Sequence, residues 1–267
     1  MARLSQRPRR SSPHYLAGPF ELFRKSSRLV RKHVWIFGPL YIIPFIFSFH
    51  AWVWTPAPDS HTNRSWWTDY SWFGSGFSAS SIPTYMWYVI VGFSFLWLVI
   101  VVAAGTIIQI MAQQAQLEAS AGKEALNFGQ LWQKVKELGW RMLGLYLLIG
   151  VYIFAPVAIW LIIYWIVGKS AIIFSPLLII SLVMLRRYFL APYLVLDKRL
   201  GITEAMDTSA EVTKAYSSSI WSIIAVMVFI SFANVIPGVG WLVAFVLGSL
   251  YSVAPALRYQ ELKRSIT

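Results

Sequence analysis

Long apolar runs alternate with polar segments along most of this chain. The six runs cover residues 34–54, 85–111, 142–166, 171–194, 219–235 and 239–257. Most of them reach the ~20 residues that a helix needs to cross a hydrocarbon core of ~30 Å. The pattern predicts an all-α fold: a polytopic integral membrane protein whose six transmembrane helices form three hairpins.

The last two runs are separated by a short segment that favours a turn. Residues 234–240 read Asn-Val-Ile-Pro-Gly-Val-Gly, and Pro and Gly mark tight turns between antiparallel helices. The alternative is one long kinked segment over 219–257, which would give five spans. We favour six.

The basic residues predict the orientation of these spans. With six spans and a cytoplasmic N-terminus, 21 of the 23 Lys and Arg residues fall on the cytoplasmic side, and only Arg64 and Lys169 fall outside. This bias follows the positive-inside rule. We therefore expect a basic cytoplasmic tail at 1–14, a single membrane domain at 15–267 with both termini inside, and an outer loop at 55–84.

Amphipathic segments precede the first, third and fifth spans and suggest a repeat. Their apolar stripes are Phe20, Phe23, Ser27 and Val30; Phe128, Leu131, Trp132, Val135 and Leu138; and Ile202, Met206, Ala210 and Tyr216. Helices of this kind lie in the headgroup plane of a membrane. The unit of interfacial helix, span, outer turn and span recurs near 15–113, 123–197 and 202–260.

Two groups of polar residues near the inner ends of spans are candidate sites. Thr106, Gln109, Gln113 and Gln116 share one face of the second span and could line a polar vestibule, although hydrogen bonding between helices is the commoner role of such groups. Arg186 and Arg187 end the fourth span and could bind a lipid headgroup, or simply extend to the interface.

Two further features are candidates for packing or docking. Small residues recur every four positions along the last span and would let another helix approach closely; this small-residue ladder is Gly240, Ala244, Gly248, Ser252 and Ala256. The outer loop is rich in aromatic side chains, which could lie on the outer leaflet or dock a partner: Trp66, Trp67, Tyr70, Trp72 and Phe73.

The composition argues against several classes of function. None of the 11 acidic residues falls within a predicted span, whereas ion-coupled pumps usually hold ionisable groups there. The chain has no cysteine, which excludes thiolate chemistry. We find no catalytic, cofactor-binding or metal-binding motif, and the blocks of positive charge between apolar runs indicate membrane topology rather than nucleic-acid binding.

The segment from the fourth to the fifth span resembles a bacterial family. It reads RYFLAPYLVLD at 187–197 and GITEAMDTS at 201–209, and the last span closes with IPGVGW at 236–241 and LRYQEL at 257–262. These residues resemble the membrane domain of some glycerophosphodiester phosphodiesterases and of related uncharacterised six-span proteins. The resemblance covers mainly 180–264. It implies a membrane module in a bacterial plasma membrane, without the soluble catalytic barrel.

The sequence leads to two functional hypotheses. The first is a non-enzymatic membrane module that serves as a scaffold or assembly partner of other membrane or envelope components, held on the anionic inner leaflet by its basic segments. The alternative is a small transporter or lipid-handling protein. That alternative predicts a cavity between the hairpins that reaches Gln109 or Gln113.

Overall fold

The fold is built from helices. The computed structural model describes residues 16–53, 84–168, 175–236 and 239–266, and within these ranges it contains no strand. The helices are α1 (Pro19–Lys32), α2 (Val34–Val53), α3 (Thr84–Ser120), α4 (Phe128–Val167), α5 (Pro176–Arg187), α6 (Ala191–Lys198), α7 (Ile202–Ala215), α8 (Ser217–Phe232), the 3-10 turn η4 (Ala233–Val235), α9 (Gly240–Tyr251) and α10 (Ala254–Ile266).

Among the described residues, four helical segments are long and apolar enough to cross a membrane. They are Phe95–Ser120, Phe128–Val167, Pro176–Lys198 and Gly240–Lys263. Two pairs of helices, α1 with α2 and α7 with α8, bend by 100° and 98° at short breaks, and counting each as a span gives up to six. Large apolar side chains on these segments point outward, such as Phe154, Trp165 and Phe229, as in helices that face lipid. The chain therefore has the architecture of an α-helical multi-pass membrane protein.

The predicted spans differ from the helices at several inner ends. We expected an interfacial helix separate from the third span, but α4 runs unbroken for 40 residues through both. The fourth and sixth runs are instead interrupted, between α5 and α6 and between α9 and α10. Pro192 and Pro255 follow these interruptions. A proline has no backbone N–H for the preceding turn and clashes with the carbonyl four residues before it, so the regular hydrogen bonding of each helix is interrupted there by a short turn.

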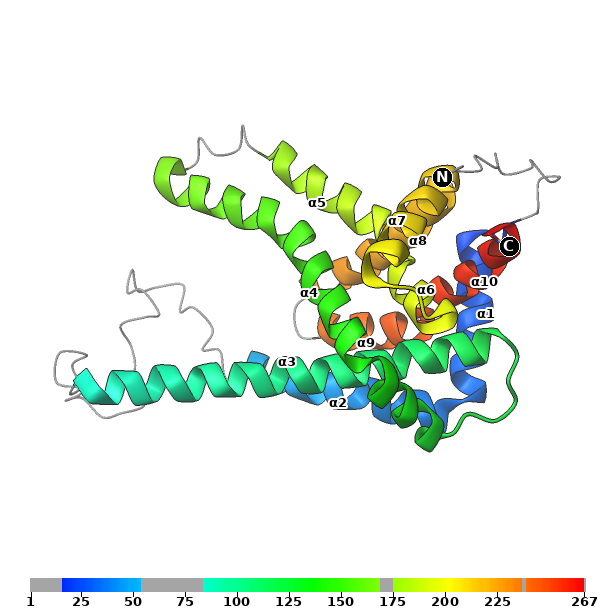
Figure 1. Ribbon diagram of the computed structural model, residues 1–267, viewed down its shortest axis with the longest axis horizontal. Helices are drawn as coiled ribbons and strands as arrows, with labels where there is room; N and C mark the ends of the chain where they lie inside the picture. The colour runs from blue at the N-terminus through cyan, green and yellow to red at the C-terminus, as the bar shows by residue number, and fades with distance from the viewer. Residues whose placement is uncertain (1–15, 54–83, 169–174, 237–238, 267) are drawn as a thin grey trace, which may run out of the picture.

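The buried core lies where the end of α3 meets α1, α4, α6, α7 and α10. Figure 1 shows α1, α6, α7 and α10 gathered at one end of the molecule, while the α4–α5 hairpin diverges from the long helix α3. The inner end of α3 contacts both α6 and α10. The rings of Tyr193 and Tyr259 stack with centroids 5.8 Å apart, and the Tyr259 hydroxyl donates to Asp197 at 2.7 Å. The three repeats are thus joined at this end.

Helices α1 and α7, which the sequence predicts to be interfacial, bury a face that differs in part from the one that we expected. The buried residues of α1 are Leu22, Ser26 and Val30, while Phe20 is 90% exposed. In α7 the buried face includes Ser209. The stripe predicted from apolar residues alone was therefore right in part, since Val30 and Met206 are buried, but each helix also buries a serine that the stripe left out.

These two serines have equivalent roles at the two helix breaks. Ser26 and Ser209 are each the eighth residue of a 14-residue helix. The Ser26 hydroxyl donates to the Leu250 carbonyl at 2.6 Å and accepts from the Val253 N–H at 3.1 Å. It thus satisfies two backbone groups that the break between α9 and α10 leaves unpaired.

Ser209 makes the same pair of bonds at the break between α5 and α6. Its hydroxyl donates to the Arg187 carbonyl at 2.9 Å and accepts from the Leu190 N–H at 3.2 Å. In both cases the carbonyl and the N–H lie three residues apart. The first and third repeats therefore each fasten an interfacial helix onto the inner end of another hairpin.

Candidate functional site

A large cavity lies between the three hairpins. Its volume is about 970 Å³, and α2, α3, α4, α5, α6, α8 and α9 all contribute to its wall. Ligand pockets commonly measure about 300–1,000 Å³, so this cavity is at the upper end of that range. It is bounded by every segment that the sequence predicts to span the membrane, and no single hairpin encloses it.

Hydrogen-bonded side chains form the inner end of the cavity. Gln116 of α3 donates from Nε2 to the Tyr41 hydroxyl at 3.2 Å and accepts from the Tyr193 hydroxyl at 3.0 Å. The Tyr41 and Ser252 hydroxyls form a hydrogen bond with each other. This network connects α2, α3, α6 and the end of α9, so it fixes the three hairpins relative to one another. We call these residues the polar floor.

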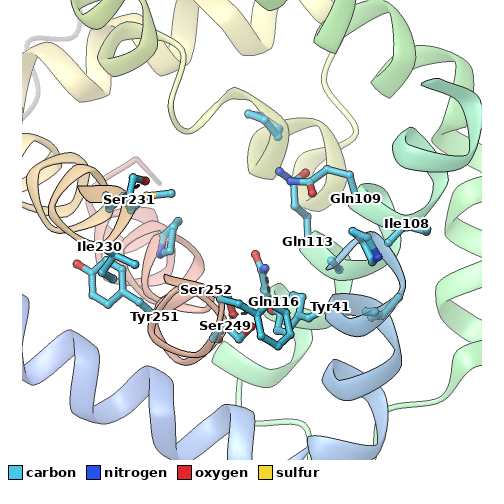
Figure 2. A pocket seen from close by; sticks show the side chains of 18 of the residues that line it. Tyr41, Ile108, Gln109, Gln113, Gln116, Ile230, Ser231, Ser249, Tyr251 and Ser252 are labelled. Carbon is cyan, nitrogen blue, oxygen red and sulfur yellow. Dashed lines mark hydrogen bonds between the residues drawn. The ribbon is translucent and has the colours of Figure 1, made fainter. Parts of the chain in front are cut away.

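Two amides on the same face of α3 have hydrogen-bonding capacity to spare. The Gln113 side-chain carbonyl accepts from Tyr146 of α4, but its Nε2 donates to no group of the described residues. Gln113 is only 7% exposed. Gln109, one turn further along α3, also lines the cavity. Figure 2 shows Gln109 and Gln113 on one side of the open centre and Ile230 and Ser231 on the opposite side.

The remaining wall is largely apolar. Leu40 and Pro44 of α2 and Ile108 of α3 line it. Near the outer turn of the last hairpin, Phe45 lies against Trp241 and Phe245, with ring centroids 5.2 and 3.9 Å away. Among the described residues that line it, there is no Asp, Glu, Lys, Arg or His. The cavity thus combines an apolar wall with an uncharged polar floor.

The structure separates the residues that we predicted to share a vestibule. Gln109, Gln113 and Gln116 line the cavity, but Thr106 does not, and its hydroxyl donates to the Val102 carbonyl of its own helix at 2.8 Å. The hydroxyls of Tyr41, Tyr146 and Tyr193 complete the polar network. Sequence analysis missed these tyrosines because each sits in a run that was counted as apolar.

The two arginines at the end of α5 lie away from the cavity. Arg186 donates from one terminal nitrogen to the Ser217 hydroxyl at 2.8 Å and lies over the Trp221 ring at 5.9 Å. Arg187 is exposed and lies 5.6 Å from the Tyr188 ring centroid. Both are in the last turn of α5, and the end of a membrane span is a position from which a guanidinium can reach lipid phosphates. The headgroup contact stays a prediction.

The small-residue ladder packs within the chain and along the cavity. Ala244, Gly248 and Ser252 line the cavity, while Ala256 is fully buried in the core. Gly240 is also buried: a Cβ built there would overlap the Ala233 carbonyl oxygen, and it would lie 3.1 Å from Cβ of Ile236. The absence of a side chain at Gly240 therefore permits the close backbone contact in the turn between α8 and α9.

The aromatic outer loop cannot be placed. Trp66, Trp67, Tyr70, Trp72 and Phe73 lie outside the described residues, so their docking role stays a prediction. Within the part of the chain that the structure describes, there is no group of three His, Cys, Asp or Glu side chains that could hold a metal ion.

Comparisons of the chain with protein-family models, with curated proteins and with solved structures find no match. The functional argument therefore depends on the geometry and chemistry of the cavity.

Proposed function

We propose that this chain is a lipid-handling protein of a bacterial plasma membrane, with six spans and both termini in the cytoplasm, which binds an amphiphile in its central cavity. The observation that carries this proposal is the cavity itself, with its apolar wall and the uncharged polar floor at Gln116. An elongated molecule with apolar chains and a polar head matches both parts. Pockets with this division of apolar wall and few polar groups are typical ligand sites.

The arrangement of the chain ends supports the proposed topology. The Arg258 side chain donates to the Ala17 carbonyl at 2.6 Å, which joins the start of α1 to α10. The segments around 112–142 and 188–217 contribute to the same core. Together with α1 and α10, these segments hold more basic than acidic residues, so this end of the molecule carries a net positive charge. The anionic cytoplasmic leaflet would attract that end.

The cavity supports lipid handling better than it supports the scaffold function that we first expected. A scaffold needs a surface free to bind a partner. The small-residue ladder, the best candidate for such a surface within a span, lies on the cavity wall or in the core. In contrast, the amides of Gln109 and Gln113 lie where the lipid-handling alternative required them.

Filling the cavity tests this function directly. Ala244 lines the cavity, so Ala244→Trp should occupy part of it and reduce the lipid that stays bound after extraction into nanodiscs. Ala104→Trp is the matched control, because Ala104 is exposed on α3 and does not line the cavity. Native mass spectrometry would count retained lipid for each variant. Equal retention by the wild type and both variants would contradict the proposal.

A further inference from the structure

The cavity has hydrogen-bond donors that the protein leaves unused. Gln113 is nine-tenths buried and accepts from Tyr146, yet no described group accepts from its Nε2. That nitrogen is not enclosed by protein atoms and reaches the open space of the cavity. Gln116 has a second N–H besides the one that it gives to Tyr41. A ligand head that displaces water from these donors must carry a hydrogen-bond acceptor.

The described wall of the cavity has no positive charge with which to bind an anionic head. No Lys, Arg or His of the part of the chain that the structure describes lines it. Arg186, the nearest candidate on α5, is directed at Ser217 and Trp221. Removing a phosphate or carboxylate from water without a charged partner is unfavourable. Tight phosphate sites in proteins usually supply such a partner, most often arginine. A phospholipid head therefore fits this site poorly.

Resting on the proposed function, we infer that the ligand is a lipid alcohol: one or more apolar chains that end in an uncharged head with a free hydroxyl. A hydroxyl accepts from Gln113 Nε2 and can donate to a neighbouring carbonyl or hydroxyl oxygen. The apolar chains would lie along Leu40 and Ile108. Diacylglycerol and long-chain isoprenoid alcohols share this chemistry.

Photoreactive lipids in nanodiscs test the ligand class. The full chain is placed in phosphatidylcholine nanodiscs that contain one of three probes with a photoreactive group in the chain: a diacylglycerol, an isoprenoid alcohol, or a phosphatidic acid with the same acyl chains as the diacylglycerol. Cross-linked peptides are mapped by mass spectrometry. We expect the alcohols to label cavity residues of α3 and α9 at least about tenfold more than phosphatidic acid does, because the phosphate lacks a charged partner.

One variant of the cavity and one control connect the labelling to Gln113. Gln113→Leu should reduce labelling by the alcohols about fivefold, the loss expected for one hydrogen bond. An unchanged unfolding transition of this variant in mixed micelles shows that the loss is not due to misfolding. Thr106→Val, outside the cavity, should label like the wild type.

The outcomes separate the inference from the proposed function. Labelling of the cavity by phosphatidic acid as strong as that by the alcohols would overturn the inference and leave a lipid-handling protein. Labelling of the cavity by no lipid at all would overturn both. If the alcohols label the cavity, the probe that labels it more strongly shows whether the ligand is a diacylglycerol or an isoprenoid alcohol.

Discussion

Replacing Gly240 by alanine is expected to destabilise the last hairpin by about 3 kcal/mol, at the upper end of the cost of overpacking. The new Cβ would overlap the Ala233 carbonyl oxygen, a backbone atom that cannot rotate away, and it would crowd Ile236. The turn between α8 and α9 would have to open to admit the methyl group. Equilibrium unfolding in mixed micelles measures the change in free energy of unfolding.

Gly248→Ala is the matched control on the same face of the same helix. A Cβ at Gly248 has only Ile230 near it, at 4.0 Å, and alanine favours a helix over glycine by about 1 kcal/mol. This variant should therefore be as stable as the wild type or slightly more stable. If Gly240→Ala were equally well tolerated, the close contact between η4 and α9 would not exist as described.

Replacing the serines that fasten α1 and α7 onto the helix breaks should also lower the free energy of unfolding. Ser26→Ala leaves the Leu250 carbonyl and the Val253 N–H without their partner, and an unsatisfied buried group costs about 1–3 kcal/mol. Ser209→Ala should cost less, because Thr213 still donates to the Arg187 carbonyl at 3.2 Å. We expect Ser26→Ala to lower the free energy of unfolding by about 2 kcal/mol and Ser209→Ala to lower it by about 1 kcal/mol.

Ser27→Ala provides the control for the first of these substitutions. The Ser27 hydroxyl is exposed and donates only to the Arg24 carbonyl in its own helix, so its loss should leave stability within about 0.5 kcal/mol of the wild type. The same unfolding measurement compares the three variants. Equal stability of Ser26→Ala and Ser27→Ala would show that α1 does not fasten the break between α9 and α10.

The sequence was informative about the spans because the bilayer fixes their length. A hydrophobic thickness of ~30 Å demands ~20 apolar residues, and the six apolar runs correspond to helices or bent pairs of helices in the structure. The breaks before Pro192 and Pro255 were missed, although proline is a visible signal. Each lies inside a run whose average hydrophobicity stays high, so both runs were taken as continuous.

The buried faces of the interfacial helices could not be found from apolar periodicity. Ser26, Ser209 and Thr213 are buried because the helix breaks need hydrogen-bond partners, and those breaks lie in other hairpins. A pattern search within one segment contains no information about such a partner. The equivalent positions of the two serines in 14-residue helices become visible only when the helix bounds and their hydrogen bonds are known.

The candidate site was predicted in part for a similar reason. Helical spacing placed the three glutamines on one face, and all three line the cavity. It could not show that Thr106 lies off that wall, because the neighbouring helices decide which part of a face is covered. The tyrosines that bond to Gln113 and Gln116 come from other helices, and their rings made them resemble ordinary core residues.

An experimental density map of the wild-type chain in lipid nanodiscs, from electron cryomicroscopy, tests the central claim most directly. We predict an open space between α3 and α9 that holds an elongated density, with its polar end beside Gln113 and Gln116. A map in which side chains of these helices meet and fill that space would contradict the account.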